Sequence, residues 1–169
     1  MARFAGGPDC DHEASERASI SIERCMDPSP KGRRNRPSAE TTARMKAVRQ
    51  RDTAPELAVR RLVHGLGVRY RVCPRDLPGR PDLVNKSKGW CIFVHGCFWH
   101  GHEGCVLARL PRTNTKWWQE KITANKARDA RKEEAMRALG FRVEVVWQCE
   151  LADEPRLLVR LGTLVDQRP

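Results

Sequence analysis

The chain lacks any apolar run long enough to cross a membrane. A spanning helix needs about 20 consecutive apolar residues, and no stretch of the 169 residues approaches that length. The first residues also lack the apolar core of a secretory signal peptide. We therefore expect a cytoplasmic protein with no membrane partner.

The cysteines do not form the pattern of a disulfide framework. There are seven of them, an odd number, and several lie close to histidines or to one another. Small secreted domains instead carry even sets of paired cysteines. The pattern favours metal binding in a reducing compartment over disulfide bonding.

Acidic residues are the scarcer charge. The 21 Asp and Glu residues against 32 Lys and Arg residues give a net charge of +11. Such a balance favours a polyanionic partner, of which nucleic acid is the commonest. A basic surface that serves only solubility is the alternative.

Apolar periodicity is missing from residues 1–40, which hold several Gly and Pro residues and the basic run 31–37. We interpret them as a disordered basic tail. Residues 41–169 are long enough for one domain with its own core. Thr53-Ala-Pro-Glu56 has the form of a capping box at the start of a helix.

The rest of the chain alternates between helical and strand periodicity. The patterns predict a helix after Thr53, strands over 68–72, 82–84 and 90–94, a long helix over 115–139, a strand over 141–147 and a last helix over 157–165. This order predicts an α/β domain with a mixed sheet flanked by helices.

A possible metal site stands out between residues 97 and 149. Cys97, His102 and Cys105 lie within one short segment, and Cys149 follows the last predicted strand. A Cys₃His set holds tetrahedral zinc, and a full complement of protein ligands is typical of a structural site. In the alternative, Cys149 is a small buried hydrophobe and the others belong to a polar loop.

Asp82 and two histidines are candidates for catalysis. Asp82 begins an apolar strand beside the strand that ends near His95, and a carboxylate at that edge can hold Mg²⁺. His95 and His100 can act as general bases or stabilise a leaving oxygen. The alternatives are a turn-capping aspartate and structural histidines.

Aromatic residues lie beside these candidates. Phe98 and Trp99 fall in a polar segment that we expect to be a loop, where exposed rings can stack on bases or wedge between them. Trp118 falls on the long predicted helix near Lys121 and Asn125, which suits a surface that faces DNA. Alternatively, Phe98 and Trp99 cover the zinc site.

Residues 41–152 resemble the very short patch repair endonucleases. The matching motifs occur in the family's order, and they are Arg51-Asp-Thr-Ala-Pro-Glu56, Leu77-Pro-Gly-Arg-Pro-Asp82, Phe93-Val-His-Gly-Cys-Phe-Trp-His100, Trp118-Gln-Glu-Lys-Ile122 and Val146-Trp-Gln-Cys-Glu-Leu151. The resemblance implies a restriction-endonuclease-like fold with a variant PD-D/E-x-K active site. It also implies catalytic Mg²⁺, structural Zn²⁺, and nicking of DNA 5′ to the thymine of T:G mismatches left by deamination of 5-methylcytosine.

The resemblance also implies a role for each matching residue. In the active site, Asp82 would be the Mg²⁺-binding aspartate with the backbone carbonyl of Val94 as a second ligand, His100 would be the catalytic histidine, His95 would support it, and Glu56 would be a helix-borne acid. The zinc ligands would be Cys97, His102, Cys105 and Cys149. The wedge beside the mismatch would consist of Phe98, Trp99 and Trp118, and Met45 would intercalate from the opposite groove. Lys121 and Asn125 would contact DNA from the same surface as Trp118.

We therefore expect a monomeric, Mg²⁺-dependent endonuclease that acts in DNA repair on double-stranded DNA with a T:G mismatch, with mismatch-repair proteins as further candidate partners. One alternative is a zinc-stabilised DNA-binding module without catalysis, but such a module has no need of Asp82 at an edge that faces phosphate. The other is a related restriction or defence nuclease with another target.

Overall fold

A computed structural model describes residues 38–166 of the chain, apart from the side chains of residues 41 and 44. The predicted tail therefore lies outside the described residues, except for its last three positions. Among the described residues, no helix is both long and apolar enough to cross a membrane.

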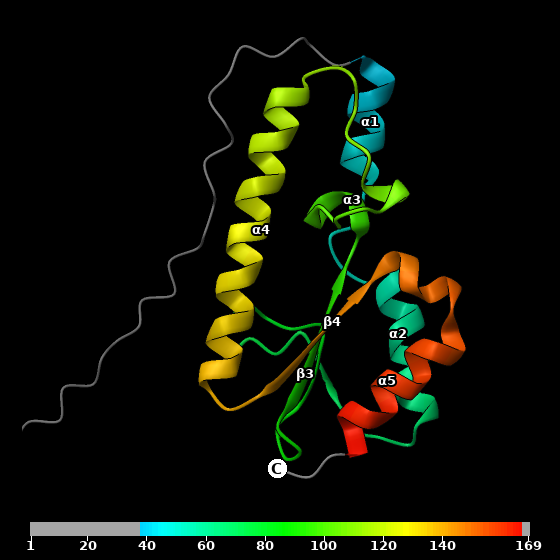
Figure 1. Ribbon diagram of the computed structural model, residues 1–169, viewed down its shortest axis with the longest axis vertical. Helices are drawn as coiled ribbons and strands as arrows, with labels where there is room; N and C mark the ends of the chain where they lie inside the picture. Colours follow the sequence, from blue (N-terminus) through cyan, green and yellow to red (C-terminus); the bar gives the residue numbers. More distant parts are fainter. Residues whose placement is uncertain (1–37, 167–169) are drawn as a thin grey trace, which may run out of the picture.

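Four strands form one mixed sheet in the order β1-β2-β3-β4 (Figure 1). The strands are β1 (Arg71–Val72), β2 (Leu83–Asn85), β3 (Trp90–His95) and β4 (Arg142–Trp147). The first three are antiparallel neighbours, whereas β4 runs parallel to β3. The parallel pair sets His95 opposite Trp147 at one end of the sheet.

Helices cover both faces of the sheet (Figure 1). Helices α2 (Ala54–Gly65) and α5 (Glu154–Asp166) lie on one side, and the long α4 (Thr115–Ala138) lies on the other. The shorter elements are α1 (Ala39–Ala47), α3 (Cys97–His100) and the 3₁₀ turns η1 (Val106–Ala108) and η2 (Gln148–Ala152). The predicted α/β class with a mixed sheet between helices is confirmed.

The central strand β3 is buried from both sides. Trp90 and Ile92 pack with α2 and α5 in the larger core cluster, whereas Cys91 and Phe93 pack with Met136 of α4 in the smaller one. A strand covered on both faces needs an unbroken apolar run rather than an alternating one, which accounts for the sequence of this segment. β3 thus leads from the core directly to His95.

Two local predictions were wrong. The strand expected over 68–72 is only two residues long. The capping box does not form: the Thr53 hydroxyl donates to Oε1 of Glu56 at 2.8 Å, and Oε2 of Glu56 accepts the Asp52 backbone N–H at 2.9 Å. Arg60 forms an ion pair with Oε2 of Glu56 at 3.2 Å. Glu56 is therefore fixed by three partners at the start of α2.

Candidate active site and metal cluster

A groove with a volume of about 410 Å³ opens where five parts of the fold meet. It lies between α1, the start of α2, the end of β3, α3 and the start of η2. The lining includes three residues predicted for catalysis, Glu56, Val94 and His100, and two predicted to contact DNA, Met45 and Trp99. The structure thus brings together residues that are widely separated in the sequence.

Asp82 lies against the end of β3, beside this groove. Its Oδ2 accepts the backbone N–H of Val94 at 2.7 Å. Burial raises the pKa of this carboxyl to about 6; the Val94 N–H acts in the opposite direction, and the charge of Glu56 adds to the rise. Within residues 38–166, Oδ1 of Asp82 has no hydrogen-bond partner. A partly buried carboxylate with a free oxygen fits a hard divalent cation, which would relieve the cost of its charge.

His100 is held by an aspartate that the sequence did not reveal. Nδ1 of His100 lies 2.6 Å from Oδ2 of Asp129 on α4. Burial is the largest single influence on the pKa of Asp129 and would raise it, but the hydrogen bond with His100 and the nearby positive charges together outweigh burial, and the pKa is lowered. Asp129 therefore stays ionised and leaves Nε2 as the ring nitrogen of His100 that can exchange a proton.

One signal could have found Asp129. The buried residues of α4 are Ile122, Asn125, Asp129 and Met136, and their spacing of three, four and seven places them on one helix face. An acid on the buried stripe of an otherwise polar helix needs a partner.

His95 lies beneath His100. The two rings stack with centroids 4.0 Å apart and planes only 5° from parallel. Burial lowers the pKa of His95 to about 3, with a smaller contribution from His100, so His95 is neutral at physiological pH.

His95, His100 and Asp129 offer ligand atoms within 4.8 Å of one another. However, an imidazole binds a metal in the plane of its ring, so two parallel stacked rings cannot both aim a lone pair at an ion between them. Their arrangement suits proton transfer better than metal binding.

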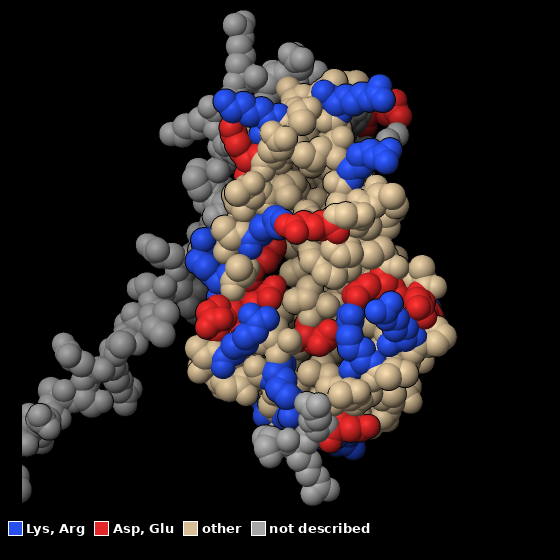
Figure 2. All heavy atoms as spheres, viewed as in Figure 1, with Lys and Arg blue, Asp and Glu red and all other residues tan. Residues whose placement is uncertain are grey.

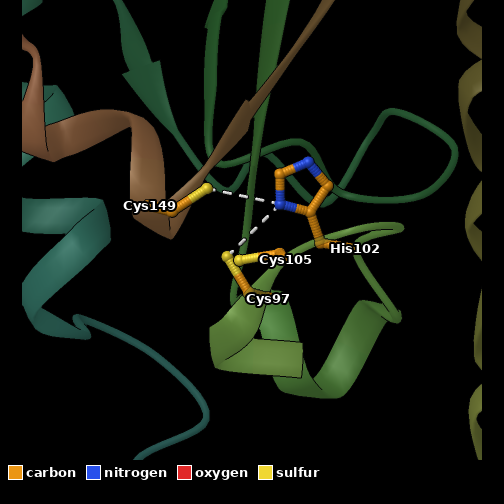
Figure 3. Close-up of side chains that lie close together, drawn as sticks. All are labelled: Cys97, His102, Cys105 and Cys149. Atoms are coloured by element: carbon orange, nitrogen blue, oxygen red, sulfur yellow. Dashed lines mark hydrogen bonds between the residues drawn. The ribbon is translucent and has the colours of Figure 1, made fainter. Parts of the chain in front are cut away.

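The four predicted zinc ligands lie together (Figure 3). Sγ of Cys97 is 3.6 Å and Sγ of Cys149 is 3.3 Å from Nδ1 of His102. Tetrahedral zinc with bonds of about 2.3 Å to sulfur and about 2.1 Å to nitrogen requires an S···N separation of about 3.6 Å. The set, completed by Cys105, therefore fits a tetrahedral ion with no position left open.

The turn after α3 brings His102 to this cluster. Gly101 ends α3 in the left-handed conformation with φ of 63°. A side chain at this position would be strained and would also collide with Ile122 of α4. Glycine therefore lets the chain reverse while α3 stays against α4.

The predicted wedge residues form an aromatic cluster beside the groove. Phe98 contacts Trp99 and Trp118 edge-on, with ring centroids 5.0 and 5.1 Å apart. All three are half-buried, and Phe98 and Trp99 lie on the helical turn α3 rather than in the expected loop. The other DNA candidates differ: Met45 is 39% exposed, whereas Asn125 is buried and donates to the Trp99 carbonyl at 2.9 Å.

Asn125 thus holds the backbone of α3 in this structure instead of facing solvent, while Lys121 on the same helix is partly exposed. On the face shown in Figure 2, Lys and Arg side chains are interleaved with Asp and Glu and form no single basic patch. Charge on this face therefore does not mark out a DNA-binding surface.

Comparisons with known proteins show which family the chain resembles. The model of the family described as DNA mismatch endonuclease Vsr matches residues 37–106. The chain is 52% identical over 122 residues to the type II nicking enzyme V.XorIIP of Xanthomonas oryzae pv. oryzae, an alignment that covers 72% of this chain and 89% of that protein.

Two further relatives match over a similar length of the chain. The DNA mismatch endonuclease Vsr of Escherichia coli K12 is 43% identical over 119 residues, covering 70% of this chain and 76% of that protein. The type II nicking enzyme V.NmeAIP of Neisseria meningitidis is 40% identical over 121 residues, covering 72% and 86%.

Proposed function

The chain belongs to the DNA mismatch endonuclease Vsr family and is a DNA endonuclease, and from this premise we propose that it nicks one strand of duplex DNA 5′ to the thymine of a T:G mismatch. The reaction would use Mg²⁺ and would start the repair of deaminated 5-methylcytosine. The observation that carries this proposal is the groove, which is lined both by Glu56, Val94 and His100 and by Met45 and Trp99. Groups suited to phosphodiester hydrolysis thus lie next to groups suited to opening a base stack.

The aromatic cluster provides a reason for mismatch preference. Inserting rings between base pairs costs a few kcal/mol of unstacking per step, and this cost is smallest where pairing is already weak. The edge-on contacts of Phe98 with Trp99 and Trp118 keep the rings in one orientation before DNA arrives. A wedge ordered in advance favours a T:G wobble over a matched pair.

Asp82 and the Val94 carbonyl would hold Mg²⁺ at the end of β3. Bound there, the ion would polarise the scissile phosphate and neutralise charge as the bond to phosphorus breaks. Asp82 is kept in place by the Val94 N–H, and Glu56 by Thr53, Asp52 and Arg60. Both carboxylates therefore have fixed positions. The second acid and the lysine that the usual nuclease motif has at this strand are absent, and the Val94 carbonyl and the histidines would take their roles.

His100 would carry the proton transfer. Its Nδ1 is bound to Asp129, so Nε2 can take a proton from the attacking water or give one to the leaving oxygen. His95 stays neutral and stacks on His100, which fixes the plane of the catalytic ring without adding a second positive charge.

The Cys97, His102, Cys105 and Cys149 cluster would bind structural Zn²⁺. Its spacing fits a closed tetrahedral site. The ion would join α3 and the loop after it to η2, beside the parallel end of β3 and β4. Its role would be to hold one wall of the groove, not to react.

A related target is a second candidate, because two of the relatives are named type II nicking enzymes. Those names support cleavage of one strand rather than two, but they leave room for a mismatch in a different sequence context. The fold and the groove are the same in both readings, and only the recognised base pairs differ.

The test is a nicking assay with purified protein, Mg²⁺ and duplexes that differ in a single T:G or C:G pair. We expect one nick, 5′ to the mismatched thymine, and none in the matched duplex or in the complementary strand. His100→Ala provides the control for contaminating nucleases. Cleavage that is equal on both duplexes, or that is independent of divalent cations, would refute the proposal.

A further inference from the structure

A chain of ring contacts connects the Cys/His cluster to the stacked pair His95 and His100. Trp147, the last residue of β4, stacks on His102 with centroids 4.2 Å apart and planes 4° from parallel. Trp147 also meets His95 edge-on at 5.2 Å and 73°. Since His95 stacks on His100, the tryptophan contacts the metal cluster directly and the catalytic histidine through one intervening ring.

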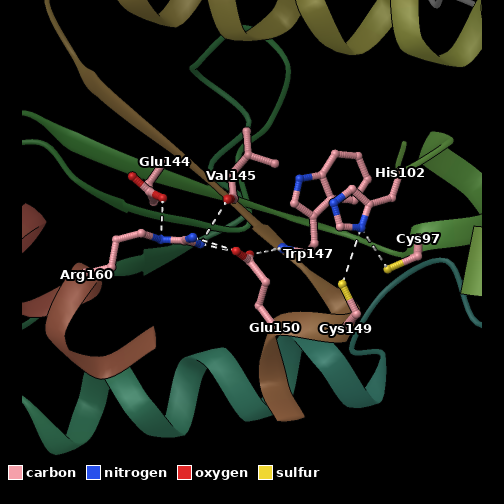
Figure 4. A network of polar contacts seen from close by, with 8 residues as sticks. All are labelled: Cys97, His102, Glu144, Val145, Trp147, Cys149, Glu150 and Arg160. Carbon is pink, nitrogen blue, oxygen red and sulfur yellow. Dashed lines mark hydrogen bonds and ion pairs between the residues drawn. The ribbon is translucent and has the colours of Figure 1, made fainter. Parts of the chain in front are cut away.

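The backbone of Trp147 is fixed from the opposite side (Figure 4). Its N–H donates to Oε2 of Glu150 at 2.7 Å. The guanidinium of Arg160 on α5 donates hydrogen bonds to both carboxylate oxygens of Glu150, at 2.5 and 2.8 Å, and to the Val145 carbonyl at 3.3 Å. These bonds tie the end of β4 to α5, so Trp147 cannot shift along the strand independently of the core.

His100 itself has little else to fix the plane of its ring. Its side chain has one hydrogen bond, to Asp129, and a single bond lets an imidazole swing about it. Stacking on His95 removes that freedom only if His95 is also immobile. The sheet register sets Trp147 opposite His95, which places the tryptophan where it can provide this support.

We propose that Trp147 is a positioning residue for the nicking reaction, which transmits the rigidity of the Cys/His cluster through His95 to His100. The inference rests on the proposed roles of these histidines and of the metal cluster. A displacement of about 1 Å in a catalytic group can lower a rate by about 10²-fold. Trp147 is thus expected to influence catalysis without touching DNA or the reacting atoms.

The experiment compares three variants of the full-length, zinc-loaded protein. Trp147→Leu keeps apolar bulk but removes the ring, and Trp147→Phe keeps a smaller ring. Phe141→Leu is the matched control. Phe141 is also a partly buried aromatic residue and lies next to β4, but it packs against the smaller core cluster, away from the histidines. For each, zinc content, the Kd for mismatched duplex and the single-turnover nicking rate are measured.

We expect Trp147→Leu to retain one zinc and a Kd within about threefold of wild type, and to nick roughly 10- to 100-fold more slowly. Trp147→Phe should recover part of the rate, and Phe141→Leu should nick normally even if it is less stable. A merely structural role predicts that both leucine variants lose rate only in proportion to the fraction of folded protein. Full activity per zinc-loaded molecule in Trp147→Leu would overturn the proposal.

A second measurement does not depend on activity. The chain has five histidines, so ¹⁵N-labelled imidazole signals can be assigned by single substitutions. Removing the Trp147 ring should shift the His95 signals and broaden the Nδ1 proton that His100 shares with Asp129, whereas Phe141→Leu should leave both unchanged. If Trp147→Leu folds poorly, the same shifts are read in Trp147→Phe.

The two proposals fail in different ways. Unchanged His95 and His100 signals in both Trp147 variants would reject the positioning role alone. Normal nicking by His100→Ala would reject the proposed catalytic site, whatever the Trp147 variants do.

Discussion

Asp82 should lower the stability of the protein while it serves catalysis, and Asp82→Asn tests this. Burial raises the pKa of the carboxyl from 3.8 to about 6, and each tenfold change in proton affinity corresponds to about 1.36 kcal/mol. Keeping Asp82 ionised in the fold without a cation therefore costs about 3 kcal/mol at pH 8. Asparagine has the same shape, and its carbonyl can still accept the Val94 N–H.

The pH dependence gives the sign of this effect. The folded pKa lies above the unfolded one, so the native state binds more protons between them, and stability falls as pH rises from about 4 to about 6. In urea titrations without Mg²⁺, Asp82→Asn should be more stable than wild type by about 3 kcal/mol at pH 8 and by about 1.5 kcal/mol at pH 5. Added Mg²⁺ should stabilise wild type and not the variant.

The same variant should bind mismatched duplex as well as wild type or better, and should not nick it, because the ligand is lost while repulsion of phosphate is reduced. Asp76→Asn is the control: Asp76 is exposed and paired with Lys86, which lowers its pKa, so its removal should give no gain in stability. An Asp82→Asn protein no more stable than wild type at pH 8, or an advantage that does not shrink at pH 5, would refute the reasoning.

Three other substitutions have distinct expected outcomes. Cys149→Ser should lower zinc content and melting temperature more than Cys73→Ser, because only the first removes a proposed ligand; purified protein without zinc would contradict this. His100→Ala should slow nicking by roughly 10²- to 10⁴-fold with DNA binding retained, and a loss below threefold would remove it from catalysis. Trp99→Ala should weaken binding to mismatched duplex by about 1–3 kcal/mol and should weaken binding to matched duplex much less. Titrations of both duplexes at one salt concentration measure this. Equal losses of affinity would mean that the ring only supports α3.

The fold and three of the four residues of the Cys/His cluster were predictable because their signals are local. The apolar run of β3 and the spacing of Leu157, Leu161 and Leu164 each depend on neighbours within a few residues. Cys97, His102 and Cys105 likewise lie in one segment, and cysteine and histidine have few other reasons to cluster.

The rest depended on contacts that sequence spacing does not reveal. Asp129 meets His100 across 29 residues, and although helix spacing places it on the same face of α4 as Ile122 and Met136, that spacing does not identify His100 as its partner. Glu56 matched a capping motif, but Arg60 one turn later offered it a stronger, charged partner. Asn125 resembled a DNA contact for the same reason that it binds the Trp99 carbonyl, since its amide has free donors in either case.

The parallel pairing of β3 with β4 has a consequence for the order in which the protein is made. All of α3, η1 and α4 separate these strands in the chain. A ribosome therefore releases His95, His100 and three side chains of the Cys/His cluster well before Trp147 and Cys149. The Cys/His cluster is complete, and His95 gains its contact with Trp147, only after the last strand docks. This is a long-range step that is slow compared with local folding. The part of the groove that Gln148 lines therefore forms only after β4 has paired with β3.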